Sequence, residues 1–486
     1  MARRAWVRVV ALAAALVVAS VALWGCASYP WAAGAAPADA ASGTHAGTAR
    51  AEGGKADANA GANANANALE FYDPSGDYRL QQAVILSRHN IRAPLSTNGS
   101  ALAKACSHQW LDWTAGSSEL TSRGAALEVM SGSYFRAWLE HAGLADHNWR
   151  PDPGAVRIYA NAKQRTLATA RAFAAGLLPA AGADVESHVD FDTMDPTFTP
   201  QVTYLTDAYA DAARAQVAGA YGNGQMSAVA QDLGDSFGLI ADVCGYRDSE
   251  GYRDGTYRDL DTSDTTVSYS LGAEPAMGGS LKTACQLADA LVLQYYETPD
   301  ERAAAFGANL SREQWSLISR AKDRYNDVLF SAPLVGVNVA HPLLGEIGRE
   351  LDADGRRLTF LCGHDSNIAS VLGAMHVRNY DLPDAIEQGT PIGSKLVIER
   401  WSAPDGRDRA RVRLVYQSTD QLRGGSMVSG YEAPRSVDLD FEGLEKSADG
   451  LFDYARLRER IATAYAAYDE LPAMYGQMGE VLEPAA

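Results

Sequence analysis

The sequence predicts an α/β fold in which a mainly helical segment is inserted into a core built around a sheet. Two apolar runs, residues 84–86 and 358–362, have the composition of buried strands, and each leads into a histidine. After the second run, apolar residues recur at helical spacing, so the chain there passes from strand through a tight turn to helix. Both histidines are expected to meet at one sheet edge, which makes the long intervening segment a separate cap.

Composition divides the 486 residues into five parts. Residues 27–69 are rich in Ala, Gly and Asn, and they have too few large apolar side chains to offset the entropy of ordering. The segment between the two histidine motifs looks helical. The expected parts are a signal segment (1–26), a disordered tether (27–69), the first part of the α/β core (70–198), an α-helical cap (199–335) and the second part of the core (336–486).

The N-terminus has the features of a bacterial export signal. Arg3 and Arg4 precede an uncharged stretch, 9–24, which is shorter than the roughly 20 residues of a membrane-spanning helix. The sequence Leu-Trp-Gly-Cys that ends at Cys26 resembles a lipoprotein cleavage box. Two outcomes stay open, a lipid anchor to the membrane through Cys26 or ordinary signal cleavage nearby. The protein is therefore expected to be periplasmic, lipid-anchored at the cell surface, or secreted.

Charge and missing motifs exclude several classes of function. The formal net charge of −18 argues against nucleic-acid binding. The patterns C-x-x-C, H-E-x-x-H and G-x-x-x-x-G-K do not occur, which removes the obvious zinc and nucleotide interpretations. Four cysteines follow Cys26 and allow three disulfide pairings, although an apolar setting makes Cys362 at least as plausible as a buried thiol. The others are Cys106, Cys244 and Cys285.

One core helix is predicted in detail. Leu127, Met130, Tyr134 and Trp138 recur at the spacing of an amphipathic helix. Thr121 precedes this stripe and is the expected N-cap. The stripe indicates packing rather than a cofactor site.

The first candidate site is the run Arg88-His89-Asn90-Ile91-Arg92, which sets an imidazole between two guanidinium groups. Guanidinium groups match phosphate oxygens two at a time, and nearby cations push a histidine toward its neutral, nucleophilic form. Taken alone, the run fits a phosphate site and a surface basic cluster about equally well.

The second candidate site is Gly363-His364-Asp365-Ser366-Asn367, at the end of the second predicted strand. Here a histidine and an aspartate lie beside a helix N-terminus, where α/β sheets commonly hold anions. Ser366 is the expected N-cap. The alternative is a structural turn with a hydrogen-bonded His364, but two strand-to-histidine turns in one chain make coincidence the weaker explanation.

These motifs resemble those of the histidine acid phosphatases, the two-domain branch of the histidine phosphatase superfamily, and among them the bacterial periplasmic glucose-1-phosphatases. The family's first motif is usually R-H-G-x-R-x-P, and Asn90 in the glycine position is a habit of that subgroup. The resemblance extends from about Tyr78 onward and implies a three-layer α/β sandwich with an inserted, mostly helical cap. Further matching blocks are 120–139, 159–170, 193–198, 291–297 and 390–401.

The resemblance also implies a role for each site residue. His89 would form a phosphohistidine, and Asp365 would protonate the leaving oxygen and later take a proton from water. Four side chains would hold the phosphoryl oxygens, namely Arg88, Arg92, Arg165 and His364. Positive charge and positioning supply most of the catalysis of phosphoryl transfer, so neither a metal nor another cofactor is expected.

The implied substrate is a small phosphomonoester such as glucose-1-phosphate. Phytase or broad acid phosphatase activity is the alternative on the same scaffold, and a non-catalytic phosphate-ester-binding lipoprotein is a third. Because binding alone needs neither a nucleophile nor a proton donor, His89 and Asp365 argue against the third. Asn90 and Glu297 are candidate selectivity residues, with Glu297 expected near the pocket mouth, where it would disfavour extra phosphates. An ordinary solvated acid is the alternative for Glu297.

Overall fold

Parallel strands bring the two histidine motifs to one edge of a mixed sheet. The computed structural model describes residues 71, 73–74, 76–95, 101–425 and 432–478, and these contain an eight-stranded sheet of order β10-β8-β7-β1-β6-β2-β3, with β9 paired to β8. β1, β6, β2 and β3 run parallel, and β7, β8, β9 and β10 pair antiparallel. The strands are β1 (Arg79–Arg88), β2 (Val156–Ala160), β3 (Val185–Glu186), β6 (Leu358–Gly363), β7 (Lys395–Ser402), β8 (Asp408–Tyr416), β9 (Arg435–Asp438) and β10 (Phe452–Asp453).

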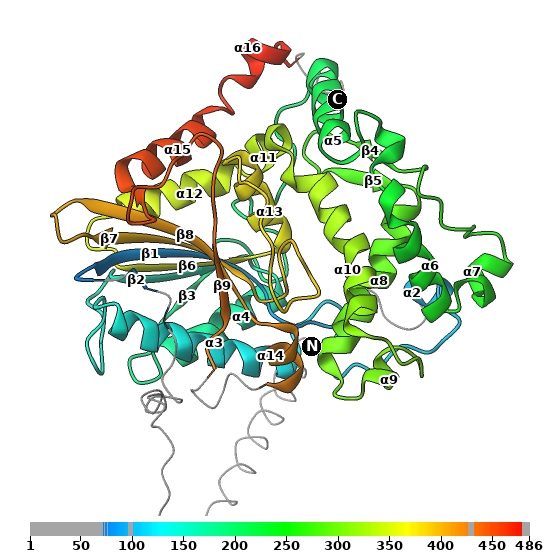
Figure 1. The fold of residues 1–486 in the computed structure, drawn as a ribbon, viewed down its shortest axis with the longest axis horizontal. Helices are drawn as coiled ribbons and strands as arrows, with labels where there is room; N and C mark the ends of the chain where they lie inside the picture. The colour runs from blue at the N-terminus through cyan, green and yellow to red at the C-terminus, as the bar shows by residue number, and fades with distance from the viewer. Residues whose placement is uncertain (1–70, 72, 75, 96–100, 426–431, 479–486) are drawn as a thin grey trace, which may run out of the picture. The chain divides into compact units, whose positions relative to one another are not determined.

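Helices cover both faces of this sheet (Figure 1). Side chains alternate along β1, so Ala83 and Ile85 join the apolar cluster under one helical layer, while Val84 and Leu86 join the cluster on the other face. This is the predicted three-layer α/β sandwich. The first layer contains α3 (Ser122–His141) and α4 (Gln164–Leu177), and the second contains α12 (His341–Asp352), α13 (Asp365–Ala374) and α15 (Tyr454–Ala466).

Helix α3 begins where the sequence predicts. The Thr121 side chain accepts a hydrogen bond from the Gly124 amide at 3.0 Å, which satisfies one free donor of the first turn. A Cβ at Gly124 would lie 2.3 Å from the Ile91 carbonyl oxygen, so glycine is needed for this helix end to approach the loop after β1. Three members of the predicted stripe are buried and Met130 is partly buried.

Residues between the two halves of the core are mainly helical, while the exact cap limits of 199 and 335 stay a prediction. α8 and α10 pack on each other, and α10 also packs on α6. The elements of this region are α5 (Asp207–Tyr221), α6 (Gly234–Val243), α7 (Glu250–Arg253), the hairpin β4 (Thr266–Ser268) and β5 (Ala276–Gly278), α8 (Ser280–Glu297), α9 (Glu301–Ala304), α10 (Arg312–Asn326), a π-helical turn (Asp327–Ser331) and α11 (Pro333–Val339).

A segment from the first half of the sequence packs against this helical region. It follows the short helix α2 (Ala101–Lys104), and two of its amides donate across to the helices. The Ser107 amide donates to the Cys244 carbonyl at 2.9 Å, and the Leu111 amide donates to Gln294 Oε1 at 2.7 Å. The segment therefore couples the chain that follows the first histidine motif to the helices.

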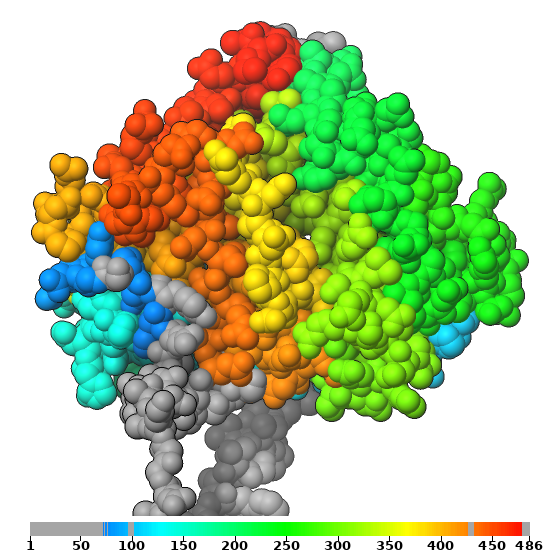
Figure 2. All heavy atoms as spheres, viewed as in Figure 1, coloured from blue at the N-terminus to red at the C-terminus, as the bar shows by residue number. Residues whose placement is uncertain are grey.

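The C-terminal part of the core lies against the helical region on the face seen in Figure 2, where segments coloured yellow to red adjoin green ones. It also contains α14 (Thr419–Gly424) and α16 (Leu471–Tyr475). The predicted signal segment, the tether and Cys26 lie outside the described residues. Among the described helices, none combines the length and hydropathy that crossing a membrane requires.

Candidate active site

A cavity of about 330 Å³ opens between the carboxyl ends of β1 and β6 and the helices α8 and α10. Arg88 pairs with Gly363 in the parallel register, so the residues that follow each strand emerge side by side. The ring centroids of His89 and His364 are consequently 5.5 Å apart. Five predicted residues line the cavity: His89, Arg92, Arg165, His364 and Asp365.

His89 is held as a neutral base. Its Nδ1 lies 2.9 Å from the Asn90 carbonyl oxygen, and donation of an N–H to that oxygen leaves the lone pair on Nε2 free. Burial first, and then the positive charge of Arg165 and Arg92, hold the pKa of His89 well below its usual range. The imidazole is therefore in the form that can attack an electrophile.

Arg88 lies at the floor of the site and is almost fully buried. Its Nη1 donates to Glu387 Oε1 at 3.1 Å and to the Thr390 carbonyl at 2.6 Å, while its Nη2 lies 3.2 Å from Asp365 Oδ2. Glu387 also pairs with the buried Lys322. Burial alone would raise the pKa of Glu387, but Lys322 and Arg88 lower it to about 2, so this carboxylate stays charged and fixes both cations.

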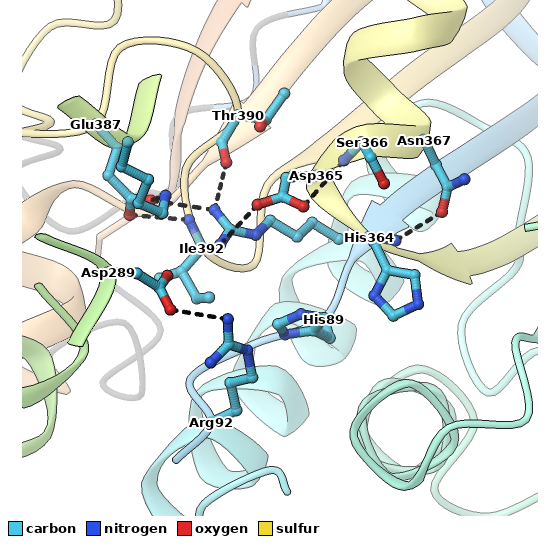
Figure 3. A network of polar contacts seen from close by, with 12 residues as sticks. His89, Arg92, Asp289, His364, Asp365, Ser366, Asn367, Glu387, Thr390 and Ile392 are labelled. Carbon is cyan, nitrogen blue, oxygen red and sulfur yellow. Dashed lines mark hydrogen bonds and ion pairs between the residues drawn. The ribbon is translucent and has the colours of Figure 1, made fainter. Parts of the chain in front are cut away.

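Two more arginines flank the imidazole. Arg92 Nη2 lies 3.0 Å from Asp289 Oδ2 on α8, a contact that Figure 3 shows beside His89. Burial and the neighbouring Arg92 lower the pKa of Arg165 to about 10, which still leaves its guanidinium charged at neutral pH. The Nε atoms of Arg88, Arg92 and Arg165 are buried without a hydrogen-bond partner among the described residues. Such unsatisfied cationic donors indicate that the site is built for an anion.

His364 and Asp365 occupy the start of α13. The N-cap is His364 and not Ser366 as predicted, because the side chain of Asn367 reaches back and accepts the His364 amide at 2.8 Å. The ring of His364 lies between Asn161 (Nε2 to Nδ2, 2.8 Å) and Arg165 (Nδ1 to Nη2, 3.4 Å). Burial alone would raise the pKa of Asp365, but Arg88 and Lys322 hold it well below its usual range.

Asn90 lies behind the nucleophile and not in the cavity. Its Nδ2 donates to Glu128 Oε2 at 2.9 Å, and its Oδ1 accepts the Ile91 amide at 2.8 Å. Glu128 pairs in turn with Lys395 of β7, so a fully buried network holds the loop. Asn90 is not among the residues with positive φ, which explains why glycine is not required there.

The expectation that Glu297 lies near the pocket mouth is wrong. Glu297 is the last residue of α8, and its Oε2 accepts a hydrogen bond from Thr121 Oγ1 at 2.8 Å, beside the start of α3. Asp289 lies about two turns earlier on the same helix and does line the cavity. The length of α8 carries Glu297 past the opening.

Sequence reasoning missed five charged residues around the site. Four of them line the cavity, namely Glu274, Lys282, Asp289 and Lys322, and Glu387 supports Arg88 from behind. Burial, followed by the negative charge of Asp365, raises the pKa of Glu274. The one available signal was Asp289, an isolated acid in the otherwise apolar part of α8. Among the described residues, no group of three or more His, Cys, Asp or Glu side chains could hold a metal ion.

Comparison with known proteins agrees with this geometry. Residues 79–220 match the model of the histidine phosphatase superfamily, branch 2. The chain is 38% identical to a glucose-1-phosphatase of Salmonella typhimurium over 78% of its length and 90% of the relative. It is 32% identical to a glucose-1-phosphatase of Providencia rettgeri, over 81% and 93%, and 28% identical to the phytase AppA of Escherichia coli, over 79% and 92%.

Solved structures show the same fold. The apo form of a Hafnia alvei phytase superposes with a TM-score of 0.73 at 24% identity and covers 82% of this chain and 99% of its own. The cation-lined cavity, the neutral His89 and the two glucose-1-phosphatase relatives agree on one chemistry. The chain therefore belongs to the histidine phosphatase superfamily, branch 2, and is an enzyme that hydrolyses phosphomonoesters.

Proposed function

We propose that the chain hydrolyses small sugar phosphates, glucose-1-phosphate above all, through a phosphohistidine at His89. The observation that carries the proposal is the neutral imidazole enclosed by three arginines whose Nε donors lack partners. A phosphate group in the cavity would satisfy these donors and would place its phosphorus next to Nε2.

Two displacements then complete the reaction. In the first, His89 Nε2 forms the N–P bond while the bond from phosphorus to the leaving alcohol oxygen breaks. In the second, water attacks the phosphohistidine, the N–P bond breaks, and phosphate leaves. Arg88, Arg92, Arg165 and His364 stabilise charge on the phosphoryl oxygens in both steps.

Asp365 moves the proton in each displacement. In the free enzyme it is a carboxylate paired with Arg88, so it needs a proton before it can donate one. A phosphomonoester has its second pKa near 6, and at mildly acidic pH a large fraction of it is a monoanion that brings this proton along. Its phosphoryl oxygens also compete for Arg88, which raises the proton affinity of Asp365. The carboxyl group then protonates the alcohol and later accepts a proton from water.

The cavity favours a substrate with one phosphate. Besides the cations it contains three carboxylates, namely Asp365 against Arg88, Asp289 against Arg92, and Glu274. A second phosphate near these groups would suffer like-charge repulsion, whereas sugar hydroxyls can donate hydrogen bonds to them. Phytate, which carries six phosphates, is therefore expected to be the poorer substrate.

The test measures phosphate release from glucose-1-phosphate and from phytate, side by side, at mildly acidic pH and without added metal. Preference for glucose-1-phosphate that disappears in His89→Ala supports both the mechanism and the substrate. Preference for phytate would be consistent with the same mechanism but would change the proposed substrate class to inositol phosphates. No release from either substrate contradicts the proposal.

We also infer export of the protein, from residues 1–26, with a lipid anchor at Cys26 or cleavage nearby as the two outcomes. Mass spectrometry of the mature N-terminus in cell envelopes distinguishes them. A diacylated Cys26 indicates an anchor, an unmodified later residue indicates cleavage, and an intact Met1 contradicts export.

A further inference from the structure

Two buried cysteines from distant parts of the sequence meet outside the active site. Cys106 follows α2, Cys244 caps the C-terminus of α6, and the two free thiols are close enough for each to shift the pKa of the other. Their exposed fractions are 4% and 0%. We propose that Cys106 and Cys244 form a disulfide bond that fastens the segment after the first histidine motif to the helical region.

The backbones on both sides hold the two sulfur atoms together. The Ser107 amide donates to the Cys244 carbonyl at 2.9 Å, which keeps the Cα atoms of the two cysteines within about 8 Å of each other. Gly245 has a φ of +53°, and a Cβ there would lie 2.1 Å from Ser107 Oγ. Contact this close leaves little backbone movement between the present geometry and that of a disulfide.

Neighbouring contacts anchor the same segment further along. His108 stacks on Phe306 with ring centroids 5.0 Å apart, and the Leu111 amide donates to Gln294. Because Cys106 is fixed from its C-terminal side by these contacts, its thiol has few alternative positions. The two sulfurs therefore have a high effective concentration for each other.

The other two described cysteines serve as internal controls. Cys285 lines the catalytic cavity, and Cys362 is fully buried in β6. All four described cysteines are free thiols in the structure, so what distinguishes Cys106 and Cys244 is their proximity to each other. This proximity favours one of the pairings that the sequence left open.

The oxidation needs a disulfide oxidant, either a small disulfide such as glutathione disulfide or a thiol–disulfide oxidoreductase. One thiolate attacks the oxidant to give a mixed disulfide, and the second thiolate displaces it to form the Cys106–Cys244 bond. The two cysteines together lose two electrons and two protons, and the oxidant is reduced to two thiols. Burial of both sulfurs implies that the bond forms during folding or local opening and then resists reductants.

The experiment refolds the full chain in a glutathione redox buffer, quenches it in acid, and unfolds it in denaturant at mildly alkaline pH so that buried thiols become accessible. Free cysteines are then labelled with one iodoacetamide isotope before reduction and with another afterwards. Cys106 and Cys244 are expected to be protected to the same extent, and the joined peptide should be lighter by two hydrogen atoms than the separate peptides. Cys285 and Cys362 should take the first label. Free Cys106 and Cys244 in strongly oxidising buffer would overturn the proposal, as would glutathione retained on either.

A stability measurement gives a second readout. The oxidised wild-type protein is expected to lose on the order of 5 °C of Tm when reduced before unfolding, because the bond restricts the unfolded chain. Cys106→Ser should remove this difference, whereas the matched variant Cys285→Ser should retain it. Equal Tm values for the oxidised and reduced wild type would contradict a structural bond. The same labelling of protein taken directly from cell envelopes shows whether the bond forms in the cell. Formation of the bond in the cell rests on the proposed export.

Discussion

The two walls of the cavity differ in how they are built. The core wall contains residues just after parallel strands and on α4, namely His89, Arg92, Arg165, His364 and Asp365. The opposite wall, called here the helical wall, includes Asp289 on α8, Lys322 on α10, and Glu274 in the turn between β4 and β5. Strand register fixes the first wall at the level of the backbone, while side-chain packing of α8 and α10 sets most of the second. This difference suggests that the core wall determines the reaction and the helical wall selects the alcohol.

The largest expected effect comes from the nucleophile on the core wall. His89→Ala should lower kcat for glucose-1-phosphate by at least about 10⁴-fold, because the covalent route is lost. Steady-state phosphate release measures this, with the Tm as a check on folding. If a folded His89→Ala variant kept a tenth of the activity, the claim that the core wall determines the reaction would be contradicted.

The support behind the core wall should have a smaller effect. Glu387→Gln weakens the anchor of Arg88 and leaves Lys322 uncompensated, so kcat should fall by about 10- to 100-fold. Glu399→Gln is the matched control, because Glu399 is an equally buried carboxylate that pairs with Arg413 away from the cavity. That control should lower the Tm and leave kcat unchanged. An equal loss of kcat in both variants would show that general destabilisation is the cause.

Substitution on the helical wall should change selectivity more than rate. Glu274→Gln removes a carboxylate that opposes extra phosphates, so the phytate to glucose-1-phosphate ratio of kcat/KM should rise by about threefold to tenfold. Glu297→Gln is the control, since Glu297 lies beside Thr121 and outside the cavity lining. If Glu297→Gln moved the ratio and Glu274→Gln did not, the assignment of the helical wall would be wrong.

The smallest expected effect concerns the stability of α10. Burial raises the pKa of Asp323 to about 7, from an ordinary value of 3.8, so the folded state holds a proton that the unfolded state releases. Stability from this group is complete below the unfolded value and is lost as pH rises through about 7. Asp323→Asn should therefore match the wild type near pH 4 and gain on the order of 1–2 kcal/mol at pH 8.

Thermal unfolding at several pH values measures this effect. In the wild type, Asp323 Oδ2 accepts a hydrogen bond from the Gln388 amide at 2.9 Å. The Asn side chain can accept the same hydrogen bond, so this contact is retained in the variant. Asp211→Asn, at an exposed position of α5, is the control for the substitution itself. If Asp323→Asn raised the free energy of unfolding by the same amount at pH 4 and at pH 8, titration of Asp323 would be excluded as the cause.

Residues of the core wall could be predicted from the sequence, whereas those of the helical wall could not, for a physical reason. A buried strand followed by a histidine is a local pattern, and parallel strands deliver their carboxyl ends to the same edge. The N-cap Thr121 is equally local. The prediction of Ser366 as the N-cap was wrong because the Asn367 side chain turns back to accept a hydrogen bond from the His364 amide. The position of the N-cap therefore depends on side-chain geometry within one helical turn.

Local patterns in the sequence were enough to predict the α/β architecture, the two histidine motifs and the phosphate chemistry, since each depends on neighbours along the chain. Which acids face the substrate became clear only from long-range contacts. These contacts set Asp289 and not Glu297 at the cavity, place Glu387 behind Arg88, and bring Cys106 close to Cys244. These contacts join residues far apart in the chain, and their free energies depend on burial and distance, which no local pattern records.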